Sequence, residues 1–160
     1  MTMKSLKDTT ILHNGVKMPW FGLGVYKAQV GEETFQAVKA AIKAGYRSID
    51  TAAFYENEES VGQAIKEAGV PREDLFITTK VWNSDQRNDT VLQAFETSIK
   101  KLDLDYVDLY LVHWPVKEKY KETWKVLEDL YRQGLVRAIG VSNFNIHHLE
   151  DLQADAQIKP

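Results

Sequence analysis

Short apolar runs alternate with longer amphipathic segments along most of the chain. The runs are rich in β-branched and aromatic residues, which predicts buried strands. They lie at residues 21–26, in a short stretch through Ile49, and at residues 75–82, 106–113 and 136–141. Residues 158–160 resemble the approach to a further strand.

Apolar residues at helical spacing follow each run, which predicts a helix after every strand. Glu32 and Glu33 open the first helix, where acidic residues suit the helix dipole, and Asn57 is a suitable N-cap for the second. The stripes consist of Phe35, Val38 and Ile42; Val61, Ala64 and Ile65; Val91, Leu92, Phe95, Ile99 and Leu102; Trp124, Leu127, Leu130 and Tyr131; and Ile146, Leu149 and Leu152. The repeat of about 25–30 residues predicts right-handed βαβ units and a parallel sheet.

Two shorter runs precede these repeats, at residues 9–12 and 16–18, and they flank Asn14 and Gly15. Asn-Gly favours the two positive-φ positions of a type I′ turn, so we expect a small β-hairpin here. The repeats themselves could close as an open doubly wound sheet or as a barrel. No Gly-x-Gly-x-x-Gly follows a strand, so a dinucleotide-binding open sheet has little support. A complete (β/α)8 barrel has about 250 residues, so a barrel built from 160 residues would be incomplete.

Composition narrows the class of protein further. The chain has a formal charge of −3, which leaves no electrostatic footprint for nucleic acid or an anionic membrane. Cysteine is absent, which excludes disulfides, a thiolate nucleophile and a Cys-based zinc site. Residues 1–8 lack the apolar core of a signal peptide, and no apolar run is long enough to span a membrane. We therefore expect a cytoplasmic protein with no metal site.

Chemically active residues gather where the predicted strands end. Ligands of parallel α/β folds bind beyond the carboxyl ends of the strands. The sequence places there Gly24, Val25 and Tyr26; Asp50, followed in its loop by Tyr55; Lys80 and Trp82; His113 and Trp114; and Ser142 and Asn143. Each has an ordinary alternative: Asp50 could cap a turn, Lys80 could extend to solvent, His113 could be structural, and Asn143 could cap a helix. The coincidence of these types at successive strand ends favours one shared site.

Asp, Tyr, Lys and His together can protonate an oxygen that gains negative charge. A tyrosine has a pKa near 10, and a nearby ammonium lowers that pKa by stabilising the phenolate. An aspartate would hold the lysine charged and in place, and a neutral histidine can orient a carbonyl oxygen by a hydrogen bond. None of these groups supplies electrons, so a hydride would have to come from a cofactor.

Two long motifs carry a resemblance to a known family. Residues 45–62 (GYRSIDTAAFYENEESVG) and 136–144 (VRAIGVSNF) are similar to the two signatures of the aldo-keto reductase superfamily. KVW at Lys80 and LVHWP around His113 stand where that family has its other catalytic residues. Within the family, the chain most resembles bacterial reductases of glyoxal and methylglyoxal.

The resemblance implies an α/β fold, a (β/α)8 TIM barrel that binds NADPH without a Rossmann fold. Residues 1–160 would be a single domain, with the N-terminal five βα units preceded by a β-hairpin. Tyr55 would be the proton donor, Lys80 and Asp50 would tune it, and His113 would orient the carbonyl. The implied cofactor residues are Gly24, Val25, Asp50, Ser142 and Asn143, and the implied walls of the substrate pocket are Tyr26, Phe54, Trp82 and Trp114.

The same resemblance implies that the chain stops where the family's sixth strand begins, before most of the residues that hold the cofactor. We therefore expect the 160-residue chain to be unstable, to self-associate or to be part of a longer protein, although the family is usually monomeric. The leading function is NADPH-dependent reduction of a small carbonyl compound. One alternative is a non-catalytic cofactor-binding or regulatory barrel, or an inactive fragment. Another is an unrelated barrel hydrolase, which would leave Tyr55 and Lys80 unexplained.

Overall fold

Five parallel strands form the central sheet of the computed structural model, which describes residues 5–160. The strands are β3 (Leu23–Gly24), β4 (Ser48–Asp50), β5 (Phe76–Val81), β6 (Val107–Val112) and β7 (Val136–Val141), and they lie side by side in chain order. The main helices are α1 (Glu32–Lys43), α2 (Glu58–Glu67), α4 (Val91–Leu102), α5 (Tyr120–Arg132) and α6 (Ile146–Asp155). A sheet of parallel neighbours with a helix in every connection is that of a partial (β/α)8 barrel. The predicted α/β class is confirmed.

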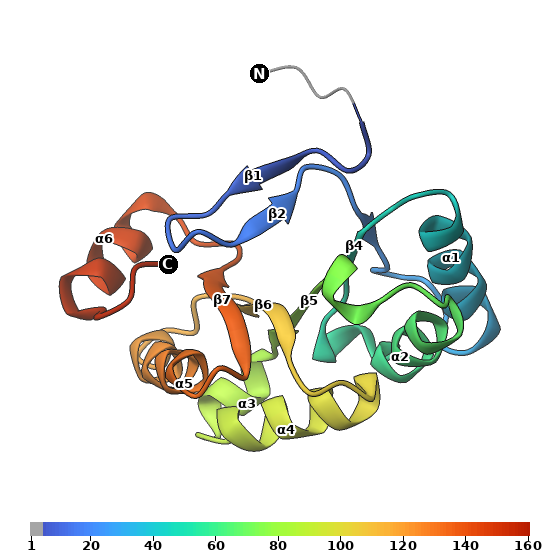
Figure 1. Cartoon of the computed structure of the whole chain (residues 1–160). Helices are drawn as coiled ribbons and strands as arrows, with labels where there is room; N and C mark the ends of the chain where they lie inside the picture. The colour runs from blue at the N-terminus through green and yellow to red at the C-terminus, as the bar shows by residue number, and fades with distance from the viewer. Residues whose placement is uncertain (1–4) are drawn as a thin grey trace.

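Shorter elements complete the chain. The hairpin strands β1 (Thr9–Ile11) and β2 (Lys17–Pro19) pair antiparallel. The remaining elements are two 3₁₀ turns, η1 (Ala53–Tyr55) and η2 (Arg72–Asp74), and the short helix α3 (Asn83–Arg87). In Figure 1 the helices lie along one side of the strands, and the hairpin crosses on the other side. No helix among residues 5–160 combines the length and apolar character needed to cross a lipid bilayer. The prediction about a signal peptide rests partly on residues 1–4, which lie outside the described residues.

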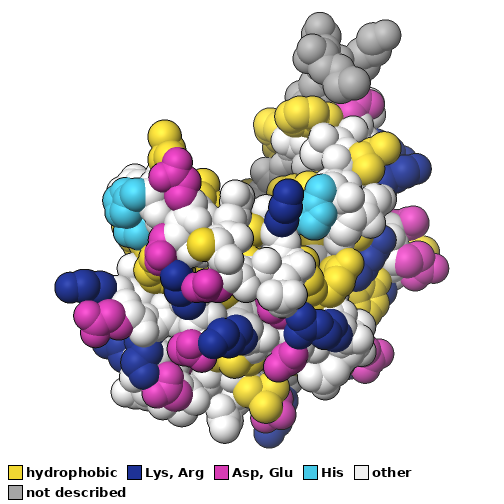
Figure 2. All heavy atoms as spheres, turned by 90° about the vertical axis from the view of Figure 1, so that its left-hand side faces the viewer, with side chains coloured by type: hydrophobic (Ala, Val, Ile, Leu, Met, Phe, Trp, Pro, Cys, Tyr) yellow, Lys and Arg dark blue, Asp and Glu magenta, His cyan; other side chains and the backbone are white. Residues whose placement is uncertain are grey.

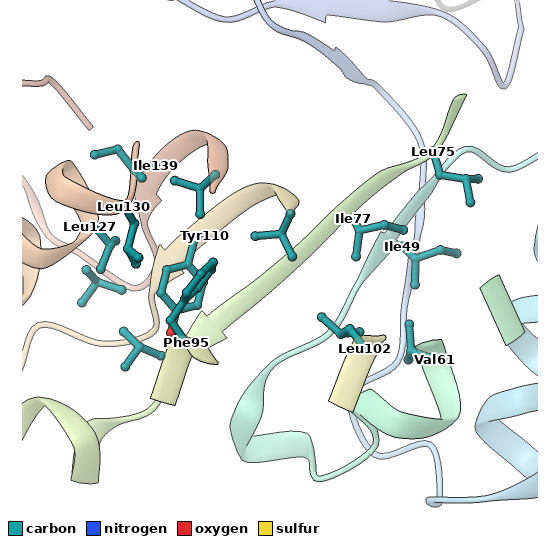
Figure 3. Close-up of a cluster of buried hydrophobic side chains, with 14 of the residues drawn as sticks. Ile49, Val61, Leu75, Ile77, Phe95, Leu102, Tyr110, Leu127, Leu130 and Ile139 are labelled. Atoms are coloured by element: carbon teal, nitrogen blue, oxygen red, sulfur yellow. The ribbon is translucent and has the colours of Figure 1, made fainter. Parts of the chain in front are cut away.

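The strands contribute side chains to two layers, because successive residues of a strand point to opposite faces. On the outer face Ile49 and Ile77 pack near Val61 of α2 and Leu102 of α4 (Figure 3). Further along the sheet, Tyr110 lies 5.0 Å from the ring of Phe95, measured between ring centroids, and Ile139 lies near Leu127 and Leu130 of α5 (Figure 3). The inner face is covered differently: Phe76, Leu109 and Ala138 contact Leu12, Val16 and Met18 of the hairpin region.

Close backbone contact joins α2 to α4 at Gly62. A Cβ atom at this position would lie 2.3 Å from the carbonyl oxygen of Leu102, well inside van der Waals contact. Only glycine therefore permits this approach of the two helices. The contact fixes α2, and with it the C-terminal end of the segment that joins β4 to α2.

A buried carboxylate joins several elements near the N-terminal ends of the strands. The Asp108 side chain is fully buried and accepts hydrogen bonds from Arg72 at 2.7 Å, Arg137 at 2.8 Å and the backbone N–H of Ile77 at 2.9 Å. Two guanidinium groups and a backbone donor together satisfy a charge that would be costly to bury alone. This cluster fixes the N-terminal ends of β5, β6 and β7.

Opposite charges are interspersed on the face that carries α5 and α6 (Figure 2). The Lys121 ammonium lies 2.8 Å from the carboxylates of both Asp151 and Asp155, and it thus links the two helices. Lys125 pairs with Glu122 within α5 at the same distance. Mixed signs of this kind are typical of a solvated helix surface.

Several predicted details of the elements are wrong. In the hairpin loop only Gly15 has a positive φ, of 86°, so the turn is not type I′. The Gly15 N–H donates to the Leu12 carbonyl instead, and the Leu12 N–H donates to Val16, both at 2.8 Å, as in a turn that continues into a bulge. The first strand is reduced to Leu23–Gly24, and residues 158–160 form no strand.

The helices also differ from the predicted pattern at two positions. Leu92 is exposed, because Val91 and Phe95 define the buried face of α4 and the next residue is turned about 100° away from it. Ile146, expected on the buried stripe of α6, is 77 % exposed because it is the first residue of the helix. The short helix α3 was not predicted, since its sequence Asn-Ser-Asp-Gln-Arg has no apolar residue.

Candidate active site

The predicted catalytic residues lie at the carboxyl ends of neighbouring strands. Asp50 is the last residue of β4, Lys80 is the penultimate residue of β5, and His113 directly follows β6. Strand alternation gives Lys80 the same orientation as Phe76, and His113 the same orientation as Leu109, both of which belong to the inner layer. Each side chain is therefore directed to the inner side of the sheet by its place in the strand.

Lys80 is the centre of this arrangement. Its ammonium donates to the Asp50 carboxylate at 2.5 Å, to the Thr51 carbonyl at 2.9 Å and to the Tyr55 hydroxyl at 3.3 Å. The Lys80 side chain is only 7 % exposed, whereas that of Asp50 is 42 % exposed. The ion pair keeps a buried ammonium charged, and the third donated bond places that charge beside the phenol.

The position of Tyr55 follows from a tight turn after β4. The 3₁₀ turn η1 ends at Tyr55, and Glu56 then adopts a left-handed conformation with φ of 57°. The chain reverses there and enters α2. As a result the Tyr55 ring lies over Lys80, with 4.9 Å between the ammonium nitrogen and the ring centroid.

His113 lies within a cluster of aromatic rings. Its ring centroid is 5.0 Å from that of Trp82 and 5.7 Å from that of Tyr55, and both contacts are edge-on. Burial, with a smaller contribution from the Lys80 charge, lowers the pKa of His113 from 6.5 to about 4. The imidazole is therefore neutral at pH 7. Its Nδ1 atom is buried and has no hydrogen-bond partner among residues 5–160.

The residues expected to line a substrate pocket divide into two groups. Phe54 stacks on Trp82 with 3.8 Å between ring centroids, and Tyr26 lies 5.0 Å from the ring of Tyr55, so these three lie around Tyr55 and His113. Trp114 is 46 % exposed and makes no ring contact with them within residues 5–160. It borders a separate surface cavity of about 590 Å³ together with Pro115.

Comparison with known proteins identifies the family. A model described as the aldo/keto reductase family matches residues 20–160. The chain belongs to the aldo/keto reductase family. The glyoxal reductase of Bacillus subtilis (strain 168) is 67 % identical over 156 residues, which cover 98 % of this chain and 56 % of that protein. The methylglyoxal reductase DkgA of Yersinia pestis is 53 % identical over 162 residues, which cover 100 % of this chain and 56 % of that protein.

Solved structures agree with this assignment. The crystal structure of an aldo-keto reductase from Bombyx mori in complex with NADP superposes with a TM-score of 0.89 at 42 % identity, covering 98 % of this chain and 57 % of that one. The chain thus spans little more than half the length of the relatives that it matches. The resemblance to reductases of glyoxal and methylglyoxal that the motifs indicated is confirmed.

The positions that the family resemblance associates with the cofactor lie on both sides of Asp50, Lys80 and His113. Ser142 and Asn143 directly follow β7, and the Asn143 amide donates to the His113 carbonyl at 2.8 Å and to the Ser142 hydroxyl at 3.0 Å. Gly24 is exposed at the end of β3, with open space where a Cβ would lie. Val25 is buried, and its N–H donates to the Asp50 carbonyl at 3.1 Å.

Two further polar residues around this candidate site were missed by sequence reasoning. Asn57 stands at the N-cap position of α2, as predicted, but its side chain makes no capping bond. It is instead fully buried and bonded to Thr51 and to the loop after β3. Glu58, the next residue, is also buried and accepts a hydrogen bond from Thr79 at 2.6 Å. The only available signal was two polar residues at the start of a helix, which ordinarily indicates capping.

Proposed function

We propose that this chain carries the catalytic half of an NADPH-dependent reductase of small aldehydes and ketones, and that 2-oxoaldehydes such as methylglyoxal are its substrates. One observation carries the proposal: a buried ammonium, that of Lys80, lies 2.5 Å from the Asp50 carboxylate and 3.3 Å from the Tyr55 hydroxyl. A phenol held beside a fixed positive charge is suited to give its proton to an oxygen. The named reductases among the relatives support the substrate class.

The side chains around the catalytic residues fit the nicotinamide end of NADPH. The Ser142 hydroxyl and the Asn143 amide are hydrogen-bonding groups suited to a carboxamide, and open space at Gly24 leaves room for a ribose against the backbone. The half-exposed Asp50 carboxylate adds an acceptor on the same side. These residues, with Val25, would hold the cofactor, which supplies the hydride when bound.

Tyr55 would complete the reduction by donating its proton to the carbonyl oxygen. The oxygen gains negative charge as the carbonyl carbon is reduced, and the Tyr55 O–H is the available acid. The phenolate that remains is stabilised by the Lys80 ammonium, and solvent then restores the proton. Asp50 acts through Lys80, because it keeps the ammonium charged and directed at the phenol.

His113 would orient the carbonyl group rather than protonate it. With its pKa lowered to about 4, the imidazole is neutral at physiological pH and can donate one hydrogen bond through Nε2. The stacked rings of Phe54 and Trp82, with Tyr26, would form an apolar wall that accepts small substrates. The alcohol product would leave through the same opening.

We further propose that residues 1–160 form one domain within a barrel and that the protein is cytoplasmic. One buried apolar cluster, from Val25 to Leu152, links the elements into a common core. A sequence without cysteine suits a reducing compartment. Among residues 5–160, β3 and β7 have no outer neighbour, so the 160-residue chain alone would associate through these edges. Native mass spectrometry measures that association.

The test uses residues 1–160 alone and also joined to the part of the Bacillus subtilis glyoxal reductase that this chain does not cover. Oxidation of NADPH with methylglyoxal is followed by absorbance. In the joined protein Tyr55→Phe should lower kcat by about 10²–10⁴-fold, the usual contribution of a general acid. Tyr46→Phe is the matched control, since Tyr46 contacts Phe21 rather than the catalytic residues, and should keep full activity. Binding of NADPH without turnover in the wild type would instead support a cofactor-binding or regulatory role.

A further inference from the structure

The buried amide of Asn57 connects two segments that border the candidate active site. The side chain is fully buried, and its Nδ2 donates to the carbonyls of Val25 at 3.0 Å and Ala28 at 3.3 Å. Its Oδ1 accepts from the Thr51 hydroxyl at 2.8 Å. Both N–H donors of the amide and its oxygen thus bind groups around the site, and none of them caps α2.

The first of these segments is the loop after β3. Its four residues run from Val25 to Ala28, closed by a hydrogen bond from the Ala28 N–H to the Val25 carbonyl at 3.1 Å. Lys27 has a positive φ of 66°, which is unfavourable for a non-glycine residue. Tyr26 projects from this loop and contacts Tyr55. The two bonds from Asn57 hold the loop in a conformation that its own sequence does not favour.

The second segment is the turn that carries Tyr55. The backbone carbonyl of Thr51 accepts one of the hydrogen bonds of Lys80, at 2.9 Å, while the Thr51 hydroxyl fixes the orientation of the Asn57 amide. Asn57 itself lies two residues after Tyr55. The amide therefore connects the turn that carries Tyr55, the Thr51 residue whose carbonyl binds Lys80, and the loop that carries Tyr26.

We propose that Asn57 is a positioning residue, whose amide holds the Tyr26 loop and the Tyr55 turn in one fixed arrangement around Lys80. This inference rests on the proposed function for its kinetic consequences, but not for its structural ones. Truncating the amide removes both of its donated bonds, so the Val25 carbonyl keeps only the bond from the Ala28 N–H and the loop is released from the turn. A displacement of about 1 Å in a reacting group lowers the rate by about 100-fold.

The test compares Asn57→Ala with Asn14→Ala in the joined protein described above. Asn14 is a matched control, because its amide also donates to a backbone carbonyl, that of Arg137 at 2.9 Å, but at the opposite end of the sheet. Asn57→Ala should lower kcat by about 10–100-fold and raise the solvent deuterium isotope effect on kcat, because proton transfer from Tyr55 becomes slower. Hydrogen exchange should increase at the N–H of Ala28 and be unchanged in Asn14→Ala.

A second pair of variants protects the test against misfolding of Asn57→Ala. Thr51→Val removes only the hydroxyl that orients the amide, whereas Thr51→Ser keeps a hydroxyl at this position. Thr51→Val should reproduce the kinetic change in part, and Thr51→Ser should resemble the wild type. The inference is overturned if folded Asn57→Ala or Thr51→Val keeps the wild-type kcat and isotope effect, or if exchange at Ala28 does not change. An inactive wild type would contradict the proposed function alone, since exchange at Ala28 and the ring signals of Tyr55 would still report whether Asn57 fixes the loop.

Discussion

The neutral state of His113 can be tested by removing the charges around it. Its pKa is lowered from 6.5 to about 4, a difference of about 2.5. Each pKa unit corresponds to about 1.4 kcal/mol, so the site disfavours the imidazolium by about 3 kcal/mol. Burial is the larger cause and the Lys80 charge the smaller. Burial should therefore account for more than half of this energy.

The variant Lys80→Met removes the positive charge, and the double variant Asp50→Asn/Lys80→Met removes both members of the ion pair. We expect the pKa of His113 to rise in each variant by less than about 1.3, half of the total difference. Titration of the imidazole signals by NMR measures this, with His113→Asn used to assign the signal among the 4 histidines of the chain. The reasoning is refuted if wild-type His113 titrates near 6.5, or if the double variant returns it to that value.

The same group affects stability as a function of pH. The unfolded chain protonates His113 near pH 6.5 and the folded chain only near pH 4, so the unfolded state binds more protons in this interval. The contribution of His113 to stability is therefore complete above pH 6.5 and is lost as the pH falls towards 4. Urea unfolding at a series of pH values should show a loss of up to about 3 kcal/mol that is absent from His113→Asn.

Two further predictions concern the elements that support the site. Gly62→Ala should destabilise the fold by about 1–3 kcal/mol, although alanine is the better helix former, because the alanine Cβ would lie 2.3 Å from the Leu102 carbonyl oxygen. Urea unfolding measures the change in stability, and a more stable variant would contradict the prediction. Burial raises the pKa of Glu58, whose carboxyl accepts from Thr79 at 2.6 Å. Glu58→Gln should therefore cost about 1 kcal/mol or less, whereas Glu58→Ala should cost about 2–4 kcal/mol, and equal losses in the two variants would refute this account.

The repeating part of the fold could be predicted from the sequence because periodicity reports burial directly. The strand Phe76–Val81 is buried along its whole length, and its β-branched and aromatic residues indicated this although Thr78, Thr79 and Lys80 are polar. The ends of the predicted strands then indicated that Asp50, Lys80 and His113 lie close together, since parallel strands end at a common edge. The family assignment agrees with what these motifs indicated.

Other features depended on contacts between distant residues and left no local pattern. Asn57 could be identified only as a helix cap, because its partners Val25 and Ala28 are brought near by the sheet and not by the sequence. Asp108 is similar, since a charge within an apolar strand is explained only when Arg72 and Arg137 are seen beside it. The conformation of the Asn14-Gly15 turn was set by the bulge that follows it, which the dipeptide alone does not encode.

The chain order of the strands also bears on how the protein is made. Each strand from β4 to β7 pairs with the strand that was synthesised just before it, so no strand of the parallel sheet waits for a distant partner within this sheet. Pairing between sequential units keeps the contact order lower than pairing between distant strands would. At about 5–20 residues per second, Asp50, Tyr55, Lys80 and His113 emerge from the ribosome within roughly ten seconds of one another. The residues of the candidate site can thus assemble during translation, one βα unit at a time.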